Sequence, residues 1–130
     1  MNVLGLGTDI IECLRIAKMI EKHGELFLNR VYTQAEIAYC SSRKGASQSY
    51  AGRWAVKESV LKAMGTGWSR GIRWKDIEVV TDLTGKPSVA IHGAAKEICA
   101  ELGISEVLIS LSLCRCHATA TAIAVGNSAD

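Results

Sequence analysis

Residues 47–67, SQSYAGRWAVKESVLKAMGTG, constrain the fold of this chain more than any other stretch. They read as one long helix that ends at the glycines of residues 65–67. At about 100° per residue, the large apolar side chains fall on one stripe: Tyr50, Trp54, Leu61 and Met64. Lys57 lies in the middle of that stripe, Glu58 at its edge, and Lys62 one turn further on. Because charges on a packing surface are costly unless they are paired, these side chains either pair or face a cleft.

Size and composition set the broad class. A length of 130 residues predicts a single domain over residues 1–130, and 48% apolar residues with one proline argue against disorder. A net charge of +2 does not by itself indicate a nucleic-acid partner, and no apolar run reaches the ~18–20 residues of a membrane span. Five cysteines, with no secretory leader before them, predict reduced thiols in a cytoplasmic protein.

Periodicity and turn signals predict short strands and helices along the chain. Thr33, with Glu36 three residues later, is typical of a capping box. Helices are expected over residues 11–23, 25–31, 34–41 and 93–102, beside the long one, and residues 42–48 should form a loop. Strands are expected over residues 3–10, 76–81, 87–92, 106–113 and 118–125, and the tail from residue 126 should be loose.

The first strand has one face made of small residues. Gly5, Gly7 and Asp9 point one way, and the other face carries Leu4, Leu6, Thr8 and Ile10. Two glycines allow a helix to approach closely, and the same face then delivers Asp9. A dinucleotide fingerprint is excluded because Ile10 stands where its third glycine is needed.

Asp9 and Glu58 are the strongest candidates for a functional site. If the long helix crosses the glycine face of the first strand, the two carboxylates meet. Such a pair suits Mg²⁺, whose coordination shell is then completed by water and substrate phosphates. The structural alternatives are an i,i+4 pair of Glu58 with Lys62, worth about 0.2–0.5 kcal/mol, and a helix-capping role for Asp9.

Other candidates have a structural alternative beside the functional one. Gly65, Thr66 and Gly67 form an ordinary helix C-cap or, with Lys62 and Arg53, an anion site. Residues 114–117, Cys-Arg-Cys-His, lack the second ligand cluster that zinc requires, so core or surface roles are favoured, as they are for His23 and His92. Arg15, Lys18 and Lys22 form a basic row on one helix face.

Several segments together resemble the holo-acyl-carrier-protein synthase family of 4′-phosphopantetheinyl transferases. The matching segments are GLGTDIIE (5–12), RVYTQAEIAYC (30–40), AGRWAVKESVLKAMGTG (51–67), DIEV (76–79) and GKP (85–87). They cover nearly the whole chain in the family's order. The resemblance implies an α+β fold, with a small antiparallel sheet packed with a long central helix, and a homotrimer with active sites between subunits.

The resemblance also implies an activity in fatty acid biosynthesis. These enzymes move 4′-phosphopantetheine from coenzyme A to a serine of apo acyl carrier protein and release adenosine 3′,5′-bisphosphate. Asp9 and Glu58 would hold Mg²⁺, while Lys62, residues 65–67 and Arg53 would hold the phosphates. Glu58, or a water beside it, would take the serine proton. The acidic carrier protein would meet the basic row and Met19.

One position departs from the family pattern. The family carries histidine at the end of its penultimate strand, where this chain has Leu113, and the nearest histidine is His117. A non-catalytic module that binds coenzyme A or the carrier protein is therefore the main alternative. RNA binding through Arg70, Arg73 and Lys75, with the tryptophans Trp68 and Trp74, is a weaker one.

Overall fold

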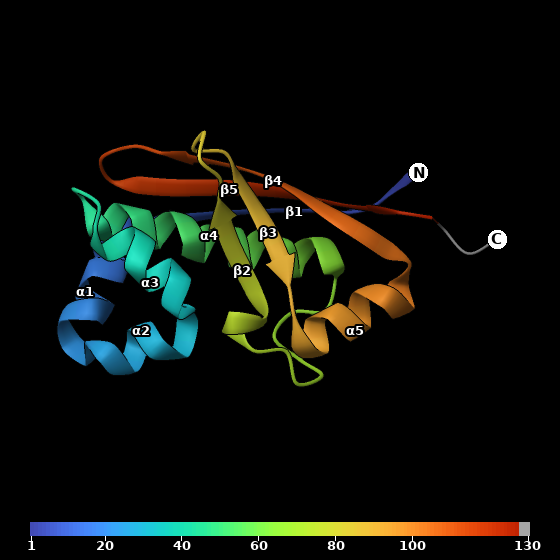
Figure 1. The fold of residues 1–130 in the computed structure, drawn as a ribbon, viewed down its shortest axis with the longest axis horizontal. Helices are drawn as coiled ribbons and strands as arrows, with labels where there is room; N and C mark the ends of the chain where they lie inside the picture. The colour runs from blue at the N-terminus through green and yellow to red at the C-terminus, as the bar shows by residue number, and fades with distance from the viewer. Residues whose placement is uncertain (128–130) are drawn as a thin grey trace.

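The computed structural model describes residues 1–127 and contains two antiparallel sheets, with helices around a long central one (Figure 1). The helices are α1 (Cys13–His23), α2 (Glu25–Val31), α3 (Gln34–Ser41), α4 (Ala46–Met64), the short η1 (Trp74–Asp76) and α5 (Gly93–Leu102). The strands are β1 (Asn2–Glu12), β2 (Ile77–Thr81), β3 (Pro87–Ile91), β4 (Ile104–Leu113) and β5 (His117–Gly126). The expected loose tail was wrong at Gly126, which ends β5, and its last three residues, 128–130, lie outside the described residues. The predicted α+β class, with a long central helix, is confirmed.

Several predicted boundaries differ from the structure, among them the start of β4 at Ile104 rather than at residue 106, and two others have clear local reasons. β1 continues to Glu12, which pairs with His117 of β5, so the first helix begins only at Cys13 rather than at residue 11. The expected loop over residues 42–48 is shorter because α4 begins at Ala46, directly after Gly45 in the left-handed conformation. The capping box is confirmed: the Thr33 hydroxyl accepts from the Glu36 N–H, and the Glu36 carboxylate accepts from the Thr33 N–H.

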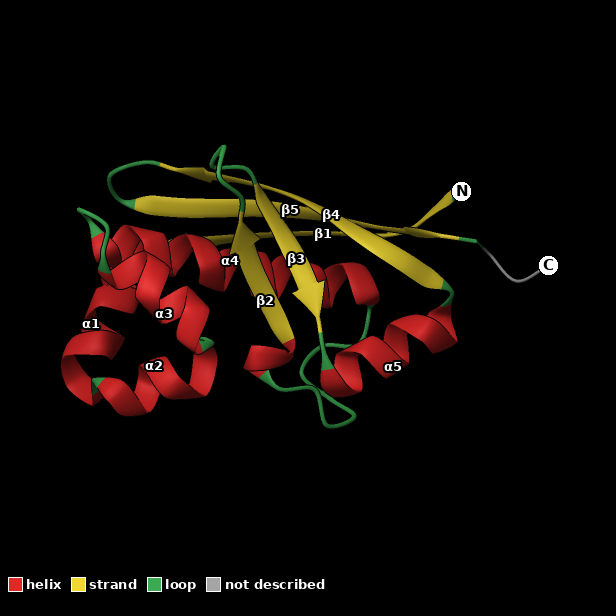
Figure 2. Ribbon diagram, viewed as in Figure 1, coloured by secondary structure: helices red, strands yellow, loops and turns green. Residues whose placement is uncertain are grey.

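The larger sheet has the order β1-β5-β4, and α4 lies across its inner face (Figure 2). That face is made of small residues. A Cβ built on Gly5 would come 1.9 Å from the Ala63 carbonyl oxygen, and one on Gly7 would come 1.9 Å from the Ser59 carbonyl oxygen. The neighbouring β5 adds a buried row of alanines: Ala118, Ala120, Ala122 and Ala124. The prediction that the long helix crosses the glycine face is therefore confirmed.

The remaining elements surround α4 on its other sides. Helices α1, α2 and α3 gather at its N-terminal end, the β2–β3 hairpin crosses it, and α5 lies near its C-terminal end (Figures 1 and 2). As a result α4 is buried on almost every side, rather than along the single apolar stripe that its sequence predicted.

Lys57 lies at the centre of this arrangement and has no solvent exposure. Its amine forms a 2.9 Å ion pair with Glu36 of α3 and donates to the carbonyls of Trp74 and Ile77. The second oxygen of Glu36 accepts the N–H of Val79 in β2 at 3.1 Å. Burial lowers the pKa of Lys57, and the charge of Glu36 opposes that shift. Of the two alternatives for the charged residues of this helix, pairing or facing a cleft, Lys57 takes the first, since its donors are occupied inside the core.

We predict that Lys57→Met destabilises the protein by about 3–5 kcal/mol, because it leaves the Glu36 carboxylate buried without its partner. The double variant Lys57→Met/Glu36→Gln should recover part of that loss, since it removes the unpaired charge. Urea unfolding gives both values. Lys62→Met is the matched control on the same helix: Lys62 is exposed, and its loss should cost about 1 kcal/mol or less. Equal losses in the two methionine variants would contradict the prediction.

Candidate active site

Asp9 and Lys62 meet where α4 crosses β1. The Lys62 amine lies 3.3 Å from an Asp9 carboxylate oxygen and donates to the Thr8 carbonyl at 2.9 Å. The Asp9 side chain is largely covered, whereas Lys62 is about half exposed. Asp9 does not cap the following helix, whose N-cap is Glu12. The close contact of Gly7 with Ser59 thus places Asp9 beside Lys62, although the two residues lie more than fifty positions apart in the sequence.

Glu58 lies on the same helix, next to this pair. Burial raises the pKa of Glu58, and the negative charge of Asp9 acts in the same direction, while an N–H from Trp68 and the charge of Lys62 oppose the shift. The Trp68 indole nitrogen lies 3.4 Å from a Glu58 carboxylate oxygen. Within residues 1–127, Lys62 forms its ion pair with Asp9, and the simple i,i+4 pair of Glu58 with Lys62 does not form.

The two carboxylates fit a hard divalent cation only in part. The described residues contain no group of three or more His, Cys, Asp or Glu side chains arranged to hold a metal ion. Asp9 and Glu58 supply carboxylate oxygens, which Mg²⁺ prefers, and Mg²⁺ commonly takes one or two carboxylates and fills its shell with water and phosphates. The donor set therefore suits Mg²⁺ that arrives with a phosphate-bearing substrate.

The glycine segment after α4 is open to solvent. Gly65 and Gly67 have left-handed backbone angles, with φ of 77° and 61°, and a Cβ on either would meet nothing within 4 Å. Gly65 forms the C-cap of α4, as the structural alternative predicted, and the Thr66 hydroxyl bonds to the Gly67 carbonyl. Lys62 lies in the last turn of the same helix, so the segment and the lysine share one end of α4.

Arg53 lies elsewhere. Its guanidinium donates to the Thr81 hydroxyl at 2.8 Å and stacks on the Tyr39 ring at 4.1 Å, while Arg43 stacks on the same ring at 4.7 Å. Neither arginine forms an ion pair within residues 1–127, and the buried Arg53 Nε has no hydrogen-bond acceptor there. Lys62 contacts β1, whereas Arg53 faces β2 and the far end of β4, so the structure does not bring the two cations together.

A cavity of about 220 Å³ opens beside these two arginines. Its walls come from α3, α4, the β2–β3 turn and the end of β4: Tyr39, Arg43, Ser49, Arg53, Thr81, Gly85, Pro87, Leu111 and Leu113. Leu113, which departs from the family pattern, is thus a wall of this pocket. His117 lies at the start of β5 and lines a different cavity with Cys13 and Cys116. Sequence reasoning missed this pocket because Arg43 lies in a polar loop without periodicity.

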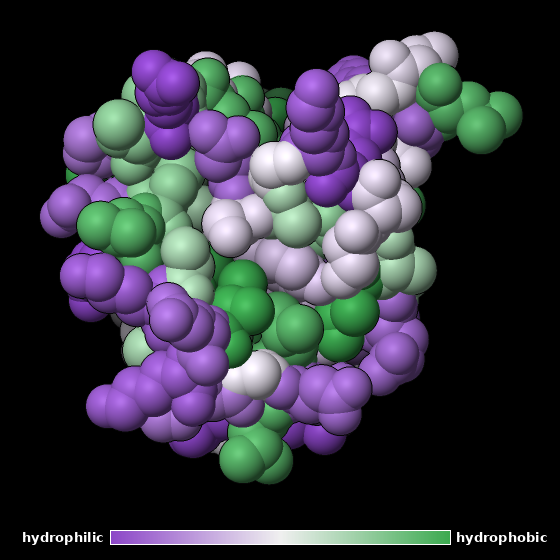
Figure 3. Space-filling model, turned by 90° about the vertical axis from the view of Figure 1, so that its left-hand side faces the viewer, coloured by the Kyte–Doolittle hydropathy of each residue, from purple (hydrophilic) through white to green (hydrophobic). Residues whose placement is uncertain are grey.

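The predicted basic row is exposed on α1. Arg15, Lys18 and Lys22 all lie in solvent, and Met19, which is 39% exposed, lies among them. Met19 also lines a hollow between α1 and α2 with Leu26 and Phe27. Figure 3 looks onto this end of the molecule, where hydrophobic surface is bordered by hydrophilic residues.

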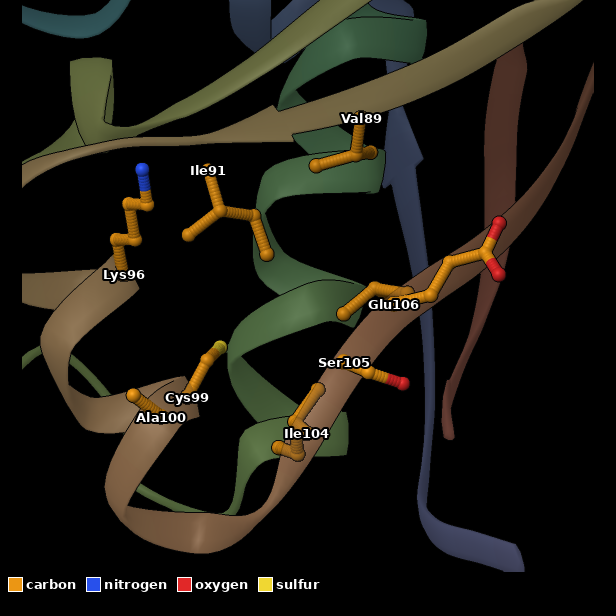
Figure 4. A pocket seen from close by; sticks show the side chains of 9 residues that line it. Val89, Ile91, Lys96, Cys99, Ala100, Ile104, Ser105 and Glu106 are labelled. Atoms are coloured by element: carbon orange, nitrogen blue, oxygen red, sulfur yellow. The ribbon is translucent and has the colours of Figure 1, made fainter. Parts of the chain in front are cut away.

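A further cavity of about 340 Å³ lies between β3, α5 and β4 (Figure 4). Its visible walls are mainly aliphatic, and it contains none of the predicted site residues. The histidines favoured as structural lie outside the site as well; His92, for example, contacts Glu78 at 3.1 Å. None of the helices within residues 1–127 is long and apolar enough to cross a membrane.

The chain belongs to the 4′-phosphopantetheinyl transferase superfamily, whose family profile matches residues 5–124. Within that superfamily its relatives are holo-[acyl-carrier-protein] synthases. The enzyme of Protochlamydia amoebophila is 48% identical over 125 residues, which cover 96% of this chain and 98% of that protein. The holo-[acyl-carrier-protein] synthase structure from Neisseria meningitidis has a TM-score of 0.88 at 31% identity, covering 95% of this chain and 99% of the other.

A third relative was solved with a ligand. The holo-(acyl-carrier-protein) synthase from Bacillus anthracis, in complex with CoA (3′,5′-ADP), has a TM-score of 0.79 at 32% identity and covers 96% of this chain and 98% of the other. The family predicted from the sequence motifs is therefore confirmed.

Proposed function

We propose that this chain is one catalytic domain that transfers 4′-phosphopantetheine from coenzyme A to a serine of apo acyl carrier protein, in fatty acid biosynthesis. The observation that carries the proposal is the ion pair of Asp9 with Lys62 where α4 crosses β1, with Glu58 on the same helix and near enough for the charges of both residues to act on its pKa. The five cysteines are all free in the structure, which fits the reducing cytoplasm.

The products define the bond that breaks. Adenosine 3′,5′-bisphosphate keeps one phosphate of the coenzyme A pyrophosphate, so the serine oxygen attacks the phosphorus on the pantetheine side and the bridging P–O bond breaks. Asp9 and Glu58 would hold Mg²⁺, and Lys62 with residues 65–67 would hold the phosphates. When bound, the ion neutralises charge on the pyrophosphate. Catalysis then comes mainly from position and charge.

We assign the acceptance of the serine proton to Glu58, directly or through one water beside it. Its raised pKa supports this role, since a carboxylate in a partly buried site binds a proton more readily than an exposed one. Asp9, by contrast, is paired with the Lys62 amine at 3.3 Å. The two acids thus have different surroundings and different expected roles.

We predict that Asp9→Asn and Glu58→Gln each lower transfer at least about 100-fold without loss of fold, because one carboxylate alone cannot complete the site. The measurement is the gain of one phosphopantetheine mass on apo carrier protein, with coenzyme A and Mg²⁺. Glu97→Gln, on α5, is the control. Wild-type rates in either site variant would remove the metal assignment, and coenzyme A binding without any mass gain by the wild type would favour the non-catalytic binding module.

The cavity between Arg43 and Arg53 fits a second anionic group. Within residues 1–127 the two guanidinium groups have no carboxylate partner, and one of them has an unbonded buried N–H, which favours a phosphate there. Coenzyme A carries such a group at the ribose 3′ position in addition to its pyrophosphate. This pocket and the Asp9 site lie at opposite edges of the β1-β5-β4 sheet. We therefore assign the two to one active site shared between neighbouring copies of the chain.

The outer face of the same sheet supports assembly into a homotrimer. Leu6, Ile123 and Leu108 are cross-strand neighbours in one row over β1, β5 and β4. Leu6 and Leu108 are 66% and 48% exposed, and Ile10, two rows further along the same face, is 68% exposed. Exposed apolar side chains that extend across a sheet from one edge strand to the other are typical of a protein–protein interface.

A mixing experiment tests the shared site. Asp9→Asn and Arg53→Met should each be inactive alone, yet co-expressed in equal amounts they should regain activity at about a quarter of the interfaces, where the intact halves meet. The measurement is the specific activity of the co-purified mixture. Mixing Asp9→Asn with Glu58→Gln is the control, because both acids lie in the same half-site. No recovery in the first mixture would contradict the shared site.

The basic face of α1 fits an acidic carrier protein. Arg15, Lys18 and Lys22 supply the charge, and Met19 with Leu26 supplies an apolar contact beside it. Charge complementarity of this kind speeds association and selects the partner.

We predict that Lys18→Glu/Lys22→Glu raises KM for the carrier protein about tenfold or more, with KM for coenzyme A unchanged, because like charges then oppose docking. The effect should shrink at high ionic strength. Steady-state kinetics against each substrate measure it. Lys96→Glu/Lys75→Glu makes the same change in net charge away from α1, and an equal rise in KM in that control would exclude a local docking face.

A further inference from the structure

Trp68 is the one large aromatic residue in the irregular segment between α4 and η1. The backbone there turns through several left-handed positions: Gly65, Gly67, Arg70 and Gly71. Such a segment offers little regular structure to fix a side chain. Trp68 is nevertheless partly buried. Its ring is held from outside the segment.

A stack of aromatic rings holds Trp68 against the core. Its ring centroid lies 3.9 Å from that of Trp74, which lies 4.2 Å from Trp54 of α4. Trp54 in turn stacks on Phe27 of α2 at 6.0 Å. Aromatic contacts of this kind add to the free energy of burial. The indole of Trp68 is thus anchored to two helices although its own backbone belongs to neither.

The anchored indole directs its only polar atom at Glu58. The Trp68 Nε1 lies 3.4 Å from Glu58 Oε1, and an indole N–H can only donate. Within residues 1–127 this is the one side-chain hydrogen bond to the Glu58 carboxylate, so Oε2 is left without a hydrogen-bond partner in that part of the chain. Glu58 Oε1 is thus held by the indole N–H, and Oε2 is available to bind a cation.

We propose that Trp68 is a positioning residue, which holds Glu58 through its indole N–H so that the carboxylate is oriented for a divalent cation shared with Asp9. The inference rests on the proposed function of Glu58. The described part of the chain offers two carboxylates and no third ligand at this place, so it has few ways to orient the ion, and a hydrogen bond to one of the ligands matters more.

Space filling is the competing explanation. Trp68 and Trp74 both line a cavity of about 490 Å³ with basic neighbours Arg30, Arg73 and Lys75. Loss of either ring would disturb that wall and the stack. The test must therefore separate the N–H from the ring.

The variant Trp68→Phe keeps an aromatic ring and removes the donor, whereas Trp74→Phe disturbs the same stack and keeps the donor. Binding of Mn²⁺ and of Mg²⁺ is measured by calorimetry in the presence of coenzyme A, with thermal unfolding recorded for each variant. We expect Trp68→Phe to weaken cation binding at least about tenfold, as removal of a hydrogen bond to a metal ligand does. Trp74→Phe should stay within about threefold of wild type.

A third variant, Trp68→His, restores a ring N–H and should recover part of the cation affinity lost in Trp68→Phe. Cation affinity unchanged in Trp68→Phe would overturn the inference, and so would equal weakening in the two phenylalanine variants, because that points to the stack alone. If the wild type binds no cation with coenzyme A present, the proposed role of Glu58 fails first. If the wild type and Trp68→Phe bind the cation equally well, the role proposed for Trp68 is wrong, while the proposed role of Glu58 stands.

Discussion

The buried ion pair between Lys57 and Glu36 is the interaction on which the arrangement of the elements depends. Both charges are removed from water, and such a pair is tolerated only when its remaining hydrogen-bonding positions are satisfied. Here the carbonyls of Trp74 and Ile77 and the N–H of Val79 complete it. The pair therefore ties α4 to α3 and to the start of β2. The β2–β3 hairpin supplies part of the wall of the Arg53 pocket, so the position of that wall depends on the ion pair as well.

One helix serves two sites because it is buried on almost every side. Its face toward β1 carries Glu58 and Lys62, and its face toward β2 carries Arg53. A surface helix offers one face to the core and the other to solvent. By contrast, α4 has neighbours all round, so charged residues on opposite faces reach different clefts. The proposed sharing of a coenzyme A molecule between copies is a direct consequence of this geometry.

The sequence could predict what depends on local spacing. Alternation in β1 put Asp9 on the glycine face, and the spacing of Thr33 and Glu36 predicted the capping box. It could not predict the partner of Lys57, which lies 21 positions earlier, or the pairing of Lys62 with Asp9 instead of Glu58. Periodicity defines the face of a helix on which a residue lies, but the neighbour that covers the face is decided by tertiary packing. Arg53 was grouped with Lys62 for that reason.

The close approach of α4 to β1 has a consequence for how this site can change. Side-chain carbons are absent at Gly5 and Gly7, and the helix backbone occupies the space they would need. The separation between the Asp9 and Glu58 carboxylates is therefore set by two missing methyl groups on the strand. A larger residue at Gly7 would push the helix away and move Glu58 with it, although every acidic and basic residue of the site would still be present in the sequence. The positions that define this chemistry thus include one that has no functional group at all.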